Sequence, residues 1–150
     1  MSASPLSSPL DAYHALCAYT WTRGDPGFIH QHVVDAFAAQ CADERTKPIA
    51  LTFALVGLYL SVERQWSGRQ VQRAHMWLAR HKGSWPPVQL PAHRGTLTAT
   101  DVIREPEGAS RDQAIRAWCA SVWAAYADAR RTIVVLLHQH GIDEAAPGTP

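Results

Sequence analysis

The sequence predicts an all-α fold, a helical bundle of four to five helices with one irregular, proline-rich connector. Apolar residues recur at spacings of three and four residues in several long segments. Turn and capping signals such as "RGDP" and "WSGRQV" separate these segments. No segment alternates apolar and polar residues in the way that indicates a strand. A length of 150 residues suits one domain with its own core.

The domain boundaries follow from composition. We expect a single helical-bundle domain over residues 9–141. Residues 1–8 and 142–150 are rich in Ser, Pro, Ala and Gly, so we expect disordered tails there.

Charge and cysteine content exclude several classes of function. The formal net charge is only +1, which argues against a nucleic-acid partner. Three cysteines without a CxxC spacing indicate a reducing compartment and no zinc ribbon. The apolar run "PIALTFALVGLYLSV" is shorter than the ~20 residues of a membrane span, and the N-terminus lacks a secretory pattern. We therefore expect a cytoplasmic protein without a membrane partner.

The first half of the chain contains three helical patterns. In the first, one face carries Leu10, Tyr13, His14, Cys17 and Trp21. Asp25 is a good N-cap for the second, which we expect over about residues 26–41; its apolar stripe comprises Ile29, Val33, Phe37 and Cys41. The third, about residues 48–66, is apolar on nearly every side and should be the central helix.

The second half begins with a helix capped by Ser67 that reaches about His81. Its expected core face consists of Val71, Ala74, His75 and Leu78. The connector "KGSWPPVQLPAHRG" should pack through Trp85 and Leu90, and a short helix follows at about residues 98–104. Ser110 and Gln113 resemble a capping box that opens a long last helix ending at Gly141. One face of that helix contains Ile115, Cys119, Val122, Tyr126, Ala129, Ile133 and Leu137.

The stretch "FIHQHVVDAFAAQ" places two histidines inside an apolar pattern. Side chains two positions apart on a helix point about 200° apart, so only one of them can face the core. His30 falls beside the apolar stripe and is the better candidate. His32 falls on another side, where Asp35 could bond its ring. The second "HQH", His138–His140, is explained by a helix C-terminus, where a cation or donor is favourable.

Three further residues share the inward placement predicted for His30. His14 and His75 lie on the apolar faces of their helices, and Glu63 shares a side with core residues of the central helix. Helical bundles hold metals with imidazole and carboxylate groups from several helices. We therefore predict a divalent metal site, with zinc foremost and manganese, nickel or iron as alternatives. Its ligands would be His14, His30 and His75, with Glu63 as fourth ligand or orienting base, and His32 and Asp35 in reserve.

Such a site would permit metal-assisted transfer or hydrolysis of a small molecule. No motif of a serine hydrolase, nucleotide-binding loop or dinucleotide-binding fold is present, so enzymatic activity is left open. Cys17 is either a ligand or nucleophile near His14, or an inert core thiol. Glu63 could instead pair with Arg64 or Arg69. The rival hypothesis is a non-catalytic ligand-binding or interaction module with a structural histidine network, in which the Trp-rich last helix mediates homodimer packing or holds an apolar ligand.

Three segments carry a resemblance to a known family. They are "AYHALCAYTWTRGDPGFIHQHVVDAFAAQ", "KPIALTFALVGLYLSVERQWSGRQVQRAHM" and "AIRAWCASVWAAY". Over roughly residues 12–128 the chain resembles an uncharacterised family of small bacterial all-helical proteins with no assigned activity. The resemblance singles out Tyr13, His14, His30, Asp35 and Glu63 for testing together.

A looser likeness in architecture is to the DinB/YfiT-like four-helix proteins, which hold a divalent metal with three histidines. Those proteins use an HxxxH pair on a later helix. This sequence has no such pair on its third or fourth helical segment, so the likeness rests on fold class alone.

Overall fold

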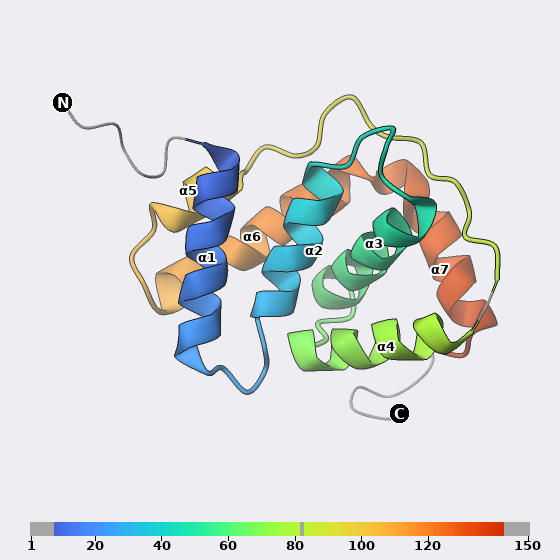
Figure 1. The fold of residues 1–150 in the computed structure, drawn as a ribbon, viewed down its shortest axis with the longest axis horizontal. Helices are drawn as coiled ribbons and strands as arrows, with labels where there is room; N and C mark the ends of the chain where they lie inside the picture. Colours follow the sequence, from blue (N-terminus) through green and yellow to red (C-terminus); the bar gives the residue numbers. More distant parts are fainter. Residues whose placement is uncertain (1–7, 82, 143–150) are drawn as a thin grey trace.

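The computed structural model describes residues 8–81 and 83–142, and these residues form helices and connecting loops without a strand (Figure 1). The all-α prediction is confirmed, although seven α-helices replace the expected four to five. Their bounds, with one short 3-10 helix η1, are α1 Pro9–Arg23, α2 His30–Gln40, α3 Pro48–Val62, α4 Gly68–Arg80, α5 Ala99–Ile103, α6 Ala109–Ala125, η1 Ala127–Ala129 and α7 Arg130–Gln139. Of the expected tails, residues 1–8 and 142–150, the structure describes only Ser8, which caps α1, and Ile142, which is buried; the rest lies outside the described residues.

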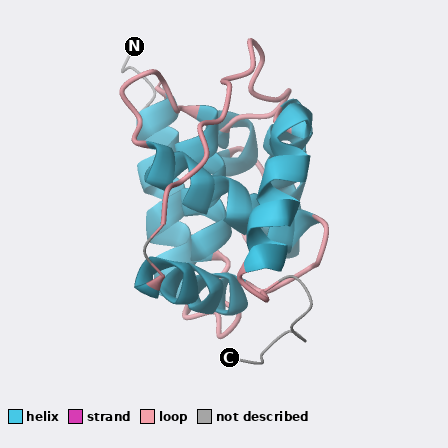
Figure 2. Ribbon diagram, turned by 90° about the vertical axis from the view of Figure 1, so that its right-hand side faces the viewer, coloured by secondary structure: helices cyan, strands magenta, loops and turns pink. Residues whose placement is uncertain are grey.

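Helix α3 is the central helix, as its composition predicts. It packs against α2, α4, α6 and α7; Figure 1 shows it between α2, α4 and α7, and Figure 2 shows the packed helices from the side. Every residue from Ala54 to Leu60 is buried, which explains why its apolar residues follow no single face. Within the described residues, no helix is both long and apolar enough to cross a bilayer.

Helix α2 is the second interior helix, because α1, α3 and α6 surround it. It approaches α3 closely at Gly57. A Cβ atom built on Gly57 would lie 1.8 Å from Asp35 Oδ2, so only glycine fits against this carboxyl group. Small residues of α2 continue the contact, since Ala36 and Ala39 are fully buried.

The turn from α3 to α4 is set by local signals. Ser67 caps α4 in a reciprocal capping box with Gln70, as predicted: Gln70 N donates to Ser67 Oγ and Ser67 N donates to Gln70 Oε1. The backbone of α4 lies close to the loop that precedes α2, because a Cβ on Gly68 would lie 1.7 Å from Phe28 O. The start of α4 is therefore fixed against the start of α2 (Figure 1).

The proline-rich connector crosses the surface without regular structure. Trp85 and Leu90 are partly buried against the core, as expected. Its far end is anchored by side chains: Arg94 Nη1 donates to Gln40 O, and Gln40 Nε2 donates to Leu97 O. The short helix α5 then follows within its predicted range, and Thr98 caps it in a reciprocal capping box with Asp101.

The long last helix is not continuous. It begins after Gly108 rather than at a Ser110 capping box, and it breaks at Tyr126 into α6, η1 and α7. The break accompanies a buried hydrogen bond in which Tyr126 Oη donates to Ala39 O at 2.6 Å. The break does not disturb the predicted face, since all seven residues assigned to it are buried. Gly141 follows the end of α7 with φ of 71°, as expected of a C-terminal glycine.

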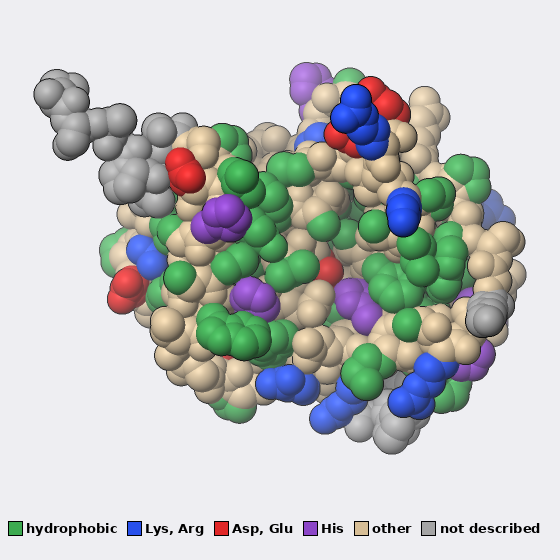
Figure 3. Space-filling model, in the orientation of Figure 1, with side chains coloured by type: hydrophobic (Ala, Val, Ile, Leu, Met, Phe, Trp, Pro, Cys, Tyr) green, Lys and Arg blue, Asp and Glu red, His purple; other side chains and the backbone are tan. Residues whose placement is uncertain are grey.

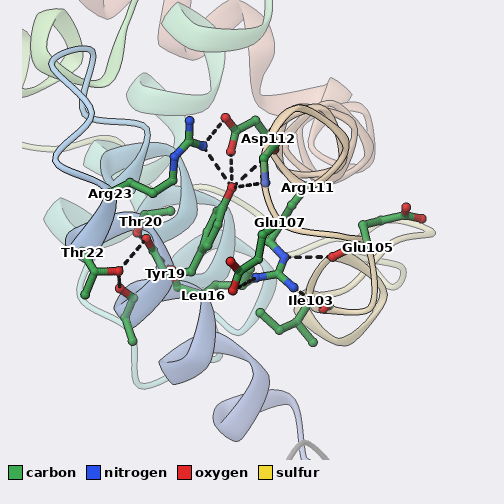
Figure 4. Close-up of polar contacts among 12 residues, drawn as sticks. Leu16, Tyr19, Thr20, Thr22, Arg23, Ile103, Glu105, Glu107, Arg111 and Asp112 are labelled. Carbon is green, nitrogen blue, oxygen red and sulfur yellow. Dashed lines mark hydrogen bonds and ion pairs between the residues drawn. The ribbon is translucent and has the colours of Figure 1, made fainter.

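A polar network joins α1 to the start of α6 (Figure 4). Tyr19 Oη donates to Asp112 Oδ1 at 2.9 Å and accepts from Gly108 N at 2.9 Å. Arg23 donates to both Tyr19 Oη and Asp112, and Arg111 lies over the Tyr19 ring. Because its polar groups are paired with one another, we interpret this network as a structural clasp between α1 and α6.

The predicted rotation of α1 about its axis is wrong, and α2 buries His32 more deeply than His30, although Ile29 and Val33 of its predicted stripe are buried as expected. Helix α1 buries Ala12, Leu16, Tyr19 and Thr20, whereas Leu10 is 52% exposed and Trp21 is 66% exposed. On the face in Figure 3, hydrophobic side chains gather over α1, and Lys and Arg side chains line the edge along α4. Alanines and cysteine are distributed around α1, so hydrophobicity alone does not fix its rotation, and the Tyr19 clasp selects the buried side.

Candidate functional site

Two of the predicted metal ligands lie on the surface. His14 is exposed on α1, where its ring lies 5.8 Å from that of Tyr13. Glu63 follows α3 and accepts hydrogen bonds from Arg130, which lowers the pKa of this carboxyl group, and from Trp123 Nε1 at 2.6 Å. Glu63 therefore joins the end of α3 to α6 and α7, and it forms an ion pair with Arg130.

The other two predicted ligands, His30 and His75, are half-buried and already have partners. His30 Nδ1 lies 2.9 Å from Thr20 Oγ1, and burial lowers the pKa of its imidazole. His75 Nε2 donates to Phe53 O at 2.7 Å, and burial lowers the pKa of this imidazole too. Each histidine thus joins one pair of neighbouring segments, α1 with α2 and α4 with α3.

The predicted four-residue metal site is therefore not assembled. Among residues 8–81 and 83–142, no three His, Cys, Asp or Glu side chains are grouped so that they could hold a metal ion. The physical reason is the rotation of α1 and α2, which turns His14 to solvent and His30 toward Thr20. Cys17 is half-buried, and burial raises the pKa of its thiol, which favours the inert alternative.

The reserve residues occupy the interior instead. His32 is 6% exposed and Asp35 is 3% exposed. Gln31 Nε2 donates to Asp35 Oδ1 at 3.0 Å, but Asp35 Oδ2 has no partner among the described residues. Burial raises the pKa of Asp35 well above its usual value, against the opposing effect of the Gln31 hydrogen bond. A neutral carboxyl group is what such a site favours.

His32 lines a cavity of about 470 Å³, within the range of small-molecule sites. The cavity lies where α2 and α4 begin and α3 ends, with α6 as its remaining wall. We call it the His32 cavity. Its lining consists of His32, Ser61, Val62, Gln65, Trp66, Ser67, Gln70, Arg116, Cys119 and Ala120.

Two residues of this lining each hold one polar atom that is buried without a partner among the described residues. These atoms are Nδ1 of His32 and Nε1 of Trp66, a side chain that is itself 6% exposed. An indole N–H can only donate a hydrogen bond. Leaving such a group buried and unpaired costs about 1–3 kcal/mol, so each calls for an acceptor or donor that the described residues do not supply.

The lining of the cavity carries one positive charge. Arg116 is the one charged side chain in its described lining, and the lining contains no carboxylate. Burial, and then the nearby Arg116 charge, lower the pKa of His32 to about 4, so this imidazole is neutral at physiological pH. Arg116 makes no ion pair or hydrogen bond within the described part of the chain, although Asp25 and His32 lie within its electrostatic reach.

The thiol in the wall is unsuited to nucleophilic chemistry. Cys119 Sγ donates to His32 O at 3.5 Å and is fully enclosed. Burial raises the pKa of this thiol above its ordinary value, so the thiolate is scarce at neutral pH. The cavity is therefore equipped to hold a molecule by hydrogen bonds and charge rather than to attack it through sulfur.

Gln65 adds a sign of local strain at the rim. Its φ is 56°, a left-handed conformation that glycine usually fills at the end of a helix. Trp66 N donates to Leu60 O, six residues back, which closes this helix end. A non-glycine residue here costs roughly 1 kcal/mol. Gln65 is retained at this cost while its side chain lines the cavity.

The sequence reasoning named His32 only in reserve and missed Trp66, Gln65 and Arg116. Gln65 and Trp66 follow a long apolar helix and look like ordinary turn residues. Arg116 looks like an exposed cation on a surface helix. One signal was available: Gln65 occupies the point where α3 must stop before the Ser67 cap, a place where glycine is the common choice.

Comparison with known proteins identifies a family but no activity. No curated protein and no solved structure matches the chain. A model of a family of unknown function, DUF5946, matches residues 10–127, which contain the whole lining of the His32 cavity. The resemblance inferred from the sequence is thereby confirmed: the chain belongs to DUF5946, a family of unknown function.

Proposed function

We propose that this protein binds a small polar molecule in the His32 cavity. The observation that carries the proposal is that two residues of its lining hold a buried, unpaired polar atom, Trp66 Nε1 and His32 Nδ1. A folded protein keeps few such groups, and those it keeps at a cavity wall are natural contacts for a ligand. This is the ligand-binding alternative considered from the sequence, at a site the sequence did not identify.

The divalent metal site receives less support from the same geometry. His14, His30, His75 and Glu63 have separate neighbours, and His32 with Asp35 would supply only two ligands. The Arg116 charge that helps to lower the pKa of His32 also opposes a cation there. Zinc or another divalent metal stays a prediction, which elemental analysis of the purified protein tests.

The binding proposal is tested by thermal unfolding in the presence of a small-molecule library. The library contains carboxylates, their primary amides and their amidines on shared scaffolds. Members that enter the cavity raise the Tm of the wild type, because a ligand of the native state stabilises it. They raise the Tm of Trp66→Phe less, because this variant keeps an aromatic ring but lacks the N–H donor.

Trp77→Phe is the matched control. Trp77 lies on α4, away from the cavity lining, and its Nε1 donates to His140 O at 3.3 Å. The control should respond to the ligands as the wild type does. A library without a single stabilising member would contradict the proposal, as would equal responses of all three proteins.

A further inference from the structure

We infer that the ligand of the His32 cavity is a small organic anion, a molecule with a carboxylate or similar group on a short hydrocarbon body. This inference rests on the proposed function and narrows it to one ligand class. It follows from the balance of donors and acceptors in the lining and from the placement of its charge.

The polar lining offers more donors than fixed acceptors. Trp66 Nε1 and the Arg116 guanidinium can only donate. Ser67 and Gln70 already use part of their capacity on each other in the capping box. His32 is neutral at physiological pH and can supply an N–H or a lone pair. A ligand that brings acceptor oxygens satisfies this set, whereas a ligand that brings donors leaves Trp66 unpaired.

The charge distribution favours the same class. Arg116 has no ion-pair partner in the described part of the chain, and no carboxylate lines the cavity to attract a cation. A carboxylate against a guanidinium forms short, charge-assisted hydrogen bonds, often two in parallel. The attraction is stronger beside a partly enclosed cavity than in open water.

The rest of the lining suits a hydrocarbon body. Val62, Ala120 and the ring of Trp66 are apolar surfaces of the cavity wall. A volume of about 470 Å³ leaves room beyond that of a bare inorganic ion. An organic anion, rather than phosphate alone, therefore matches both parts of the lining.

The test compares ligands of one shape and different charge. Kd values are measured by isothermal titration calorimetry for benzoate, benzamide and benzamidine, for the best scaffold from the thermal screen in the same three forms, and for inorganic phosphate. On the better scaffold we expect the carboxylate to bind at least about tenfold more tightly than its amide, and the amidine to bind more weakly still. An amide or amidine that binds as tightly as the carboxylate overturns the inference but leaves the proposed function intact. Phosphate that binds as tightly as the best carboxylate overturns the organic part. If no form binds, both proposals fail.

Two variants test whether Arg116 is the residue that recognises the negative charge of the ligand. In Arg116→Gln the preference for the carboxylate ligand over its amide should fall to within about threefold. The glutamine side chain keeps a hydrogen-bond donor but lacks the positive charge. Arg131→Gln removes an exposed arginine on α7 that does not line the cavity, and it should keep the full preference. Equal preferences in the two variants would overturn the assignment of Arg116.

Gln65→Gly tests whether the strained side chain serves the ligand. Glycine relieves the left-handed conformation, so the midpoint of urea unfolding should rise without ligand. The same variant should bind the carboxylate several-fold more weakly, because it loses a lining side chain. A higher midpoint with unchanged binding would remove Gln65 from the site.

Discussion

His32 and Asp35 are polar residues placed where the chain could have used apolar ones. Each is nearly enclosed, and each keeps one ring or carboxyl atom without a partner in the described structure. Interior polar groups of this kind are usually paired, because an unpaired group loses its hydration without replacement. His32 and Asp35 are therefore the first residues to test by substitution.

The pH dependence of stability should report the enclosure of His32. In the native state its pKa is lowered from 6.5 to about 4, so the unfolded chain binds a proton over this window while the native protein does not. The free energy of unfolding therefore falls as the pH drops from 6.5 to 4, by about 3 kcal/mol from this residue. In His32→Gln that fall should shrink by the same amount, as measured by urea denaturation at several pH values.

The wild-type profile, measured at the same pH values, is the reference. Asp35 contributes with the opposite sign, because its raised pKa removes stability as the pH rises. That contribution is common to both proteins and cancels in the comparison. A His32→Gln profile that matches the wild type would mean that His32 reaches solvent.

The contact of Gly57 with Asp35 predicts a large effect of one methyl group. Gly57→Ala would place a carbon 1.8 Å from Asp35 Oδ2, and we expect a loss of about 3 kcal/mol in the free energy of unfolding. Gly83→Ala is the control, since a Cβ there meets nothing within 4 Å, and it should change stability by less than about 0.5 kcal/mol. In an Asp35→Ala background the cost of Gly57→Ala should fall below about 1 kcal/mol. Equal losses in the two backgrounds would show that the clash lies elsewhere.

At the element scale, the clasp between α1 and α6 is the contact with the clearest test. Tyr19→Phe keeps the ring but removes the hydroxyl that bonds Asp112 and Gly108. We expect a loss of about 2 kcal/mol and faster hydrogen exchange at the Gly108 amide. Tyr13→Phe, on the same helix, should cost well under 1 kcal/mol, because its half-buried ring stacks on Phe37 at 4.0 Å with or without the hydroxyl. A Gly108 amide that exchanges at the wild-type rate in Tyr19→Phe would contradict the clasp.

Most elements were predictable from the sequence because their signals are local. The Ser67 and Thr98 caps, the all-round apolar character of α3 and the buried face from Ile115 to Leu137 each depend on a few neighbouring residues. The rotations of α1 and α2 were not predictable, because they depend on partners distant in sequence. Tyr19 reaches Asp112, and α2 is enclosed on three sides, so it can bury His32 as well as its apolar residues.

The metal prediction is not supported by a cluster of ligands among the described residues, for the same reason. It required His14, His30, His75 and Glu63 to converge, and convergence depends on rotations that single-sequence periodicity leaves open. The predicted reserve residues proved to be the interior ones, because Gly57 leaves space for a carboxyl group that no helical wheel of α2 reveals. The cavity was invisible for a related reason, since four helices and one turn contribute to its lining.

At the scale of the whole molecule, the helices form a donor-rich cavity with one arginine in its lining at the meeting point of α2, α3, α4 and α6. Three of the helices that form its walls are tightly packed. Helix α3 is buried, α4 lies against Phe28 O at Gly68, and Cys119 of α6 contacts the backbone of α2 at His32. A binding site built on firmly packed helices is preorganised, so little free energy is lost in ordering it when a ligand enters.

The most direct measurement follows the indole N–H resonance of Trp66 while the best carboxylate from the screen is added to ¹⁵N-labelled protein. Trp66→Phe assigns the resonance, and the resonance of Trp77 serves as an internal reference. If the carboxylate binds in the His32 cavity, the Trp66 signal shifts progressively to saturation, with the Kd found by calorimetry, while the Trp77 signal stays in place. A ligand that stabilises the protein but leaves the Trp66 resonance unmoved would show that binding occurs outside the His32 cavity and would contradict the proposed function.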